Sequence, residues 1–220
     1  MKLVAIPIAL LALAGVTPGP QPAATLAPAR TAAEVLARVA GTQTPLESFA
    51  VPVTIGGSAR VSFLSVPFTV HGMQYFEAPN KQAMHLTDAP SLAQGFQNAV
   101  STMGTPQTWE YVYDITLQGT QQRHKHFAYV LVGIPKRAAN VKSFTMLVGE
   151  KSDAVESVDF AYTNGASLAV DFAHHHAHPY HLPTSAIVTA HFPQYSGTAT
   201  IQYGSYQLNV PIPDSVFQKQ

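Results

Sequence analysis

The sequence contains no cysteine and few charged residues. Without cysteine, a disulfide scaffold, a zinc site with cysteine ligands and a cysteine nucleophile are all excluded. Lys and Arg number 12, Asp and Glu also number 12, and charged residues make up only 11% of the chain. Because no surplus of positive charge is available to contact phosphates, we expect no nucleic-acid partner. Hydrophobic residues reach 46%, so the 220 residues can form a packed domain.

The common catalytic motifs are also missing from the sequence. It has no G-x-S-x-G nucleophile elbow, no H-E-x-x-H helix, no Walker loop and no dinucleotide fingerprint. Glu110 and Asp114 lie four residues apart, but in a strand pattern they share a solvent-facing side, which indicates no cleft for acid–base chemistry. We therefore expect a protein that is not an enzyme and requires no cofactor.

The N-terminal residues 1–29 have the pattern of a signal peptide followed by a linker. Lys2 precedes an apolar run over residues 3–16, and residues 17–29 are rich in Pro and Ala. About 14 apolar residues are too few to cross a hydrocarbon core of about 30 Å, which favours a cleaved signal over the alternative, a retained anchor. The sequence thus predicts export, with residues 30–220 forming a single domain.

Helical patterns occur in two segments of this domain. Thr31 and Glu34 form a capping box at the start of a predicted helix over residues 31–41, and Gly41 suits its C-cap. Residues 89–104 carry apolar side chains at helical spacing, which predicts a second helix or a helical lid.

Most of the remaining chain alternates with a period of two, which is typical of strands. The clearest runs are 64–70, 111–118, 158–162 and 168–172, the last two joined by the hairpin dipeptide Asn164–Gly165. Further strands are predicted near 46–55, 73–78, 81–87, 124–134, 142–149, 185–192 and 198–212. A change of phase at Gly204–Ser205 indicates a bulge in the last of these. The pattern predicts an α+β fold with one large antiparallel sheet of about 11 strands, which must curl or close.

Several short segments in this order resemble a known family. They are residues 46–50, 72–81, 113–119, 127–131, 162–165 and 200–217. Together the chain resembles the periplasmic outer-membrane lipoprotein carrier LolA and its lipoprotein-sorting relatives. The resemblance implies an incomplete, strongly curved antiparallel barrel covered by helices, with an apolar hollow for lipoprotein acyl chains or another lipid. It also implies a periplasmic monomer that receives cargo from an inner-membrane donor and delivers it to an outer-membrane acceptor.

One position departs from the family pattern. Typical carriers have an Arg directly before the Pro of a Pro-Asn turn, where it helps to hold the lid closed, but here Ala78 precedes Pro79. A relative with a different lipidic cargo fits the sequence as well as a true lipoprotein carrier does. A regulatory domain that senses lipoproteins is a further alternative.

If the hollow exists, aromatic and aliphatic side chains are expected to line it. The candidates are Phe63, Phe68, Tyr75, Leu92, Phe96, Met103, Trp109, Tyr111 and Tyr113, with Leu92, Phe96 and Met103 on the lid side. The alternative for each of them is an ordinary core position beneath the helices.

Histidines are concentrated in residues 174–181. On an extended segment His174, His176 and His178 share one face, and His181 follows, which is plausible spacing for Zn²⁺ or another divalent metal. A periplasmic metal-binding protein is therefore an alternative function. A hydrophilic loop without a role and a pH-responsive loop are the other interpretations.

Overall fold

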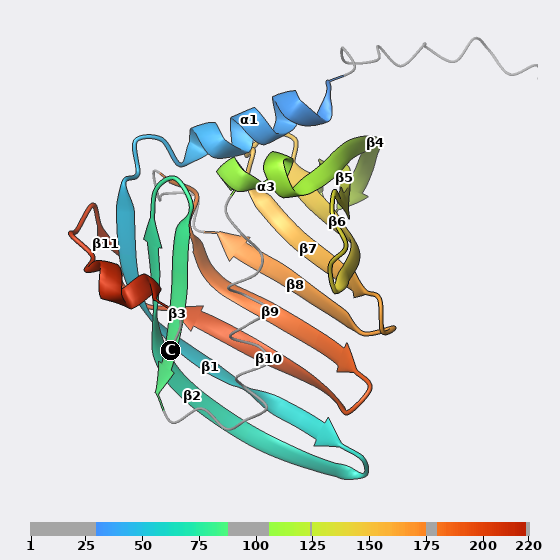
Figure 1. Cartoon of the computed structure of the whole chain (residues 1–220), viewed down its shortest axis with the longest axis vertical. Coiled ribbons are helices and arrows are strands. Elements are labelled where there is room, and N and C mark those ends of the chain that lie inside the picture. The colour runs from blue at the N-terminus through green and yellow to red at the C-terminus, as the bar shows by residue number, and fades with distance from the viewer. Residues whose placement is uncertain (1–29, 88–105, 124, 175–179, 219–220) are drawn as a thin grey trace, which may run out of the picture.

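One large curved antiparallel sheet dominates the fold, with helices across one end of it (Figure 1). The computed structural model describes residues 30–87, 106–123, 125–174 and 180–218. Its elements are α1 (Ala32–Thr42), β1 (Ser48–Val61), β2 (Leu64–Glu77), β3 (Lys81–Thr87), α3 (Pro106–Val112), β4 (Tyr113–Arg123), β5 (His126–Pro135), β6 (Val141–Gly149), β7 (Val155–Tyr162), β8 (Ser167–His174), β9 (Pro183–Phe192), β10 (Tyr195–Tyr203), β11 (Gln207–Leu208) and η1 (Asp214–Phe217). The predicted α+β fold with about 11 strands in an incomplete barrel is confirmed.

Neighbouring strands along the main order of the sheet are consecutive in the chain, except for β1 and β10, which pair although they are far apart in the sequence. The strand order is β3-β2-β1-β10-β9-β8-β7-β6-β5-β4, and β11 pairs with β1 beside β10. The pairing of β1 with β10 joins the beginning of the described chain to its end. Since β3 and β4 are the two edges of this order, the sheet curls without closing into a full barrel.

Apolar side chains form continuous rows across one face of the sheet, here called the inner face. One row consists of directly opposed residues in β5 to β10: Leu131, Met146, Val158, Val170, Val188 and Ala199. All six are buried. Such cross-strand pairs fix the register, because a slip by one residue would expose the entire row.

Helix α1 begins as the sequence predicts and ends differently. The capping box is present: Glu34 N–H donates to Thr31 Oγ1 at 3.2 Å, and Thr31 N–H donates to Glu34 Oε2 at 2.7 Å. The predicted C-cap at Gly41 is wrong, because the helix continues to Thr42 and Gln43 caps it. Gln43 keeps a right-handed conformation (φ −98°), so no left-handed glycine is needed there.

The two strands predicted at 64–70 and 73–78 are one strand, β2. Gly72 lies inside it at a place where β3 approaches closely, since a Cβ added at Gly72 would meet His85 O at 2.2 Å. Gly72 therefore allows the close approach of β3 and does not mark a break between two strands.

The prediction that Tyr111 lies in a strand is also wrong. Tyr111 belongs to α3, whose first residue is Pro106, and β4 begins only at Tyr113. Proline is favoured in the first turn of a helix, where its missing N–H costs nothing. The helix predicted over residues 89–104 lies outside the described residues.

The predicted irregularity at Gly204–Ser205 is confirmed as one extra residue. Val53 of β1 pairs with Tyr203, and Ala50 of β1 pairs with Gln207. Two residues of β1, 51–52, therefore lie opposite three residues, 204–206, between β10 and β11. The strand predicted over 198–212 is interrupted here, so β10 ends at Tyr203 and only β11 resumes the pairing. Gly204 N–H donates to Pro52 O at 2.8 Å and holds the bulge against β1.

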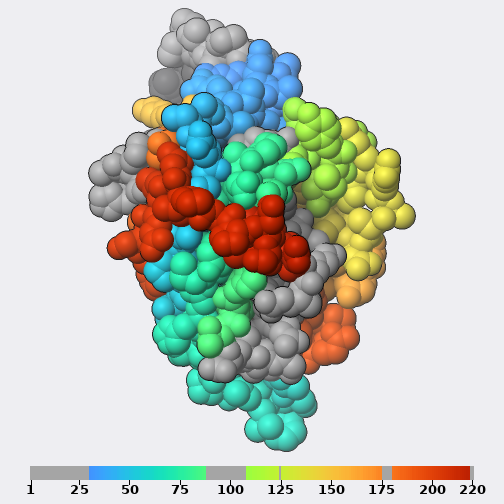
Figure 2. Space-filling view, turned by 60° about the vertical axis from the view of Figure 1, so that its left-hand side comes forward, coloured from blue at the N-terminus to red at the C-terminus, as the bar shows by residue number. Residues whose placement is uncertain are grey.

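The C-terminal segment packs on the outer face of β3 (Figure 2). Lys81 Nζ donates to Asp214 Oδ1 at 2.6 Å, and His85 Nε2 lies 2.7 Å from Val216 O. These contacts attach η1 to an edge strand and cover part of that edge. None of the helices that the structure describes is long and apolar enough to cross a membrane.

Candidate ligand-binding pocket

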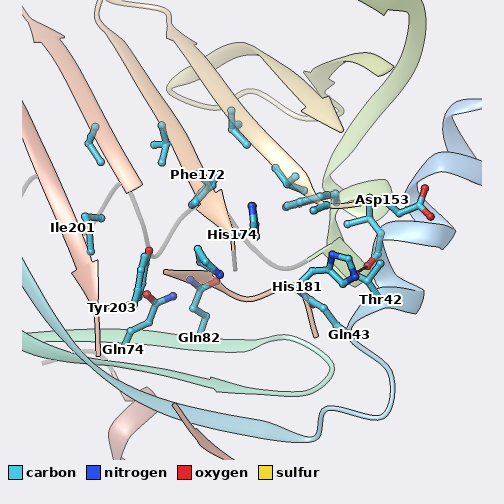
Figure 3. Close-up of a pocket in the computed structure, with 18 residues that line it drawn as sticks. Thr42, Gln43, Gln74, Gln82, Asp153, Phe172, His174, His181, Ile201 and Tyr203 are labelled. Carbon is cyan, nitrogen blue, oxygen red and sulfur yellow. Dashed lines mark hydrogen bonds between the residues drawn. The ribbon is translucent and has the colours of Figure 1, made fainter. Parts of the chain in front are cut away.

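A pocket of about 160 Å³ lies between the inner face of the sheet and the helices α1 and α3 (Figure 3). Its walls come from both helices, from strands β2, β3, β7, β8, β9 and β10, and from three connecting segments. The volume is far above the roughly 15 Å³ that one water needs and below the roughly 300 Å³ of the smallest drug-sized sites. It therefore suits one slim group, such as part of a single acyl chain.

The middle of the pocket is apolar. Aliphatic residues of adjacent strands meet the underside of α1 and α3 here; the apolar wall consists of Val39, Trp109, Val155, Val158, Val170, Phe172, Val188 and Ile201. Val158, Val170 and Val188 are directly opposed members of the inner-face row. A lining of this kind removes water from any hydrocarbon that enters.

One end of the pocket is polar and is formed by Gln74, Gln82 and Tyr203. The registers of β2, β3 and β10 place all three side chains on the inner face, and Figure 3 shows them close together. Gln74 is only 9% exposed, and its Oε1 has no hydrogen-bond partner among the described residues. A buried amide without a partner costs about 1–3 kcal/mol, so a hydrogen-bonding group bound here would recover free energy.

Tyr203 keeps its proton at this end of the pocket. Burial raises the pKa of its phenol well above the ordinary value for tyrosine. Its ring stacks against Tyr206, with 6.2 Å between centroids, and the Tyr206 hydroxyl donates to Pro183 O at 2.7 Å. The Tyr203 hydroxyl is thus a neutral group that can both donate and accept.

The other end of the pocket lies at the C-terminus of α1. Thr42, Gln43, His181 and Asp153 line it together (Figure 3). Arg38 on α1 donates to Asp153 Oδ2 from Nε at 2.9 Å and from Nη2 at 2.5 Å. The hydrogen bond with Asp153 raises the pKa of the Arg38 guanidinium, so this side chain stays charged.

Two of the nine residues predicted to contact lipid line described pockets. Trp109, at 7% exposed, lines the pocket above and also a second one of about 10 Å³, which Tyr113 lines as well. Phe68 lies half-buried on the inner face, outside the lining. Leu92, Phe96 and Met103 lie outside the described residues.

The structure does not bring Phe63, Tyr75 and Tyr111 to the pocket. Phe63 is 88% exposed in the turn between β1 and β2, and Tyr111 is 82% exposed on α3. Tyr75 has the opposite orientation to Gln74 in β2 and contacts the His85 ring, 5.7 Å between centroids, on the outer face. Period-two alternation alone does not show which of the two faces of a strand is the inner one.

The histidine-rich segment reaches the pocket in part. His174 and His181 are lining residues, whereas His176 and His178 lie outside the described residues. In the part of the chain that the structure describes, no group of three or more His, Cys, Asp or Glu side chains is placed to hold a metal ion.

The sequence-based prediction missed the polar residues of the pocket. The predicted site lacks Gln74, Gln82, Tyr203 and Asp153, because the prediction depends on aromatic and aliphatic side chains in other segments. One signal was present: Gln74 occupies a position in β2 with the same orientation as the buried Phe76. A polar residue at an inward position of a strand is informative, because burial without a partner is costly.

Neither a family model nor a curated protein matches the sequence. Solved structures match the fold. A DUF1329 family protein from Desulfovibrio piger is 12% identical, with a TM-score of 0.63 over 84% of this chain and 95% of that one. A LolA superfamily protein from Nitrosomonas europaea is 15% identical, with a TM-score of 0.58 over 87% of this chain and 99% of that one. An outer-membrane lipoprotein-sorting protein domain from Vibrio parahaemolyticus is 10% identical, with a TM-score of 0.59 over 84% of this chain and 94% of that one. The chain therefore has a LolA-like fold.

Proposed function

We propose that the protein is a non-enzymatic carrier that binds an acyl chain of a lipid or lipoprotein between its curved sheet and its helices. The observation that carries the proposal is the apolar pocket, whose wall is built from buried side chains of β7 to β10 and from Trp109. Similar structures include a LolA superfamily protein and a lipoprotein-sorting domain, which supports a cargo of this class.

The size of the pocket favours reversible binding. Each methylene group removed from water contributes about 0.8 kcal/mol, so six of them contribute about 5 kcal/mol. That corresponds to a dissociation constant near the millimolar range, before any contribution from polar contacts. A short buried segment therefore allows release to an acceptor without a covalent step.

We extend the proposal to export and transfer. Residues 1–29 would act as a signal peptide that directs the chain to the periplasm, and the mature monomer would exchange cargo between an inner-membrane donor and an outer-membrane acceptor. The apolar run at the N-terminus supports export. A lipoprotein-sensing role and a metal-binding role of the histidine-rich segment remain alternative predictions.

The test is calorimetric titration of delipidated protein with 1-octanoylglycerol and with octanoate. We expect saturable binding of at least one of them, weakened tenfold or more by Val188→Phe, which places extra atoms in the pocket. The matched control is Ile187→Phe, because Ile187 is the preceding residue of β9 and is 50% exposed. If Val188→Phe unfolds, Val188→Leu adds one methylene instead. No saturable binding by the wild type, or equal binding by a folded pocket variant, would contradict the proposal.

A further inference from the structure

The polar end of the pocket contains a buried amide oxygen that has no hydrogen-bond partner among the described residues. Gln74 is more than nine-tenths buried, lines the pocket, and has no hydrogen-bond partner for Oε1 among the described residues. Burying an amide oxygen without a hydrogen bond costs free energy, and an apolar residue of similar shape at this position would avoid that cost. A half-turn of the amide exchanges Oε1 with Nε2, so Gln74 can present either an acceptor or a donor to a bound molecule.

Gln82 and Tyr203 complete a group of neutral hydrogen-bonding side chains around Gln74 (Figure 3). The two amides can donate and accept, and so can the phenol hydroxyl. Among the lining residues that the structure describes, none is Lys or Arg. Arg38 and Asp153 form an ion pair at the opposite end, where Asp153 Oδ2 accepts from Arg38 and Asp153 Oδ1 has no hydrogen-bond partner among the described residues.

We propose that Gln74, Gln82 and Tyr203 bind the head of the carried lipid, and that this head is uncharged and bears both a hydrogen-bond donor and an acceptor. The inference rests on the proposed acyl-chain carriage and assigns the chemical class of the ligand. A hydroxyl, as in an acylglycerol, or a secondary amide, as in an N-acylated peptide, meets this requirement.

Gln74, Gln82 and Tyr203, the described residues that line this end, include no Lys, Arg or His, which disfavours an anionic head. A carboxylate that enters the pocket loses its hydration, and neither an amide nor a phenol neutralises its charge. A hydroxyl or an amide exchanges its water contacts for the Gln74 amide and the Tyr203 hydroxyl at much lower cost. Among lipids with acyl chains of equal length, the pocket therefore favours those with a neutral head over those with an anionic head.

Three octanoyl compounds of matched chain length test the proposal: 1-octanoylglycerol, N-octanoylglycinamide and octanoate, each titrated calorimetrically at pH 8. The wild type should bind the two neutral compounds about tenfold more tightly than octanoate. Gln74→Leu should reduce this preference to about twofold or less while the protein stays folded, because the change removes a buried amide oxygen that has no partner among the described residues. The matched control is Gln202→Leu, an exposed position on β10.

The tighter of the two neutral compounds identifies the source of the head, a glycerolipid or an N-acyl peptide. An unchanged preference in Gln74→Leu, or a wild type that prefers octanoate, would overturn the inference while leaving acyl-chain carriage intact. Failure of the wild type to bind any of the three compounds would instead overturn the proposed function itself.

Discussion

Arg38 of α1 donates two hydrogen bonds to the same oxygen of Asp153, from Nε at 2.9 Å and from Nη2 at 2.5 Å. Asp153 lies in the turn between β6 and β7 and lines the pocket, so the pair attaches the covering helix to the sheet at the pocket edge. The Asp153 side chain is 14% exposed and that of Arg38 is 42% exposed. This pair is consequently more protected from solvent than an ordinary surface ion pair.

Replacing Arg38 by Met keeps the aliphatic stem and removes both hydrogen bonds. We expect the free energy of unfolding to fall by about 1–2 kcal/mol, because Asp153 is left without its cation. Hydrogen exchange in α1 should also accelerate, since the helix loses a contact with the sheet. Arg137→Met, at an exposed position, is the control and should change neither quantity. Unchanged exchange in the Arg38 variant would show that the pair does not hold α1.

The contact between Lys81 and Asp214 predicts a pH effect at the C-terminal segment. The hydrogen bond from Lys81 lowers the pKa of the Asp214 carboxyl. A lowered pKa in the folded state means that the stabilisation is present above the ordinary aspartate value and is lost as the pH falls through the folded value. We therefore expect η1 to detach from β3 in acid before the sheet unfolds.

The measurement is a carbon-detected NMR titration of the Asp214 carboxyl. In Lys81→Met its pKa should return toward the ordinary value, while Lys142→Met, a change at another exposed lysine, should leave it lowered. An identical titration in the wild type and in Lys81→Met would rule out the contact as the cause.

Asp159 on β7 predicts the opposite dependence on pH. Partial desolvation, followed by repulsion from Asp171, raises the pKa of its carboxyl, and Arg123 offsets this only in part. The folded state then favours the protonated form, so stability is lost as the pH rises through the raised value. Asp159→Asn should stabilise the protein at pH 7 by up to about 0.5 kcal/mol, and the gain should vanish near pH 3. Urea unfolding at both pH values measures it, and a gain of equal size at both would contradict the electrostatic explanation.

Trp109 and Val158 line both described pockets, and Trp109 has the larger side chain of the two. Trp109→Leu should merge them and admit wider ligands, at a cost of about 3 kcal/mol in unfolding free energy. Affinity for the bulky neutral probe N-phenyl-1-naphthylamine should rise relative to 1-octanoylglycerol. Phe160→Leu, which enlarges only the smaller pocket, is the control. If both variants shift the two affinities equally, Trp109 is not the dividing wall.

Much of the fold could be predicted from the sequence, because hydrophobic periodicity reports which side of an element is buried. The capping box at Thr31 and Glu34 and the strand at residues 81–87 are where the pattern places them. The errors occurred where one local signal has two physical uses. Gly72 breaks a pattern yet lies in a continuous strand, since it allows β3 to approach.

The pocket could be predicted far less well. Which strand positions face the same space depends on the pairing of β1 with β10, a contact between distant parts of the chain that no local pattern encodes. For this reason the apolar pattern indicates Trp109 but not Gln74 or Tyr203, and Tyr75, which is expected at the hollow, lies on the outer face.

Trp109 also provides the most direct test of acyl-chain binding, because it is the only tryptophan in the sequence and lines the pocket. Bromine quenches indole fluorescence on contact, so 1-(8-bromooctanoyl)glycerol reports whether the chain reaches this side chain. We predict saturable quenching in the wild type and in Ile187→Phe, and its loss in Val188→Phe. Quenching that rises linearly with probe concentration, or that is the same in all three proteins, would contradict binding of the acyl chain in the pocket.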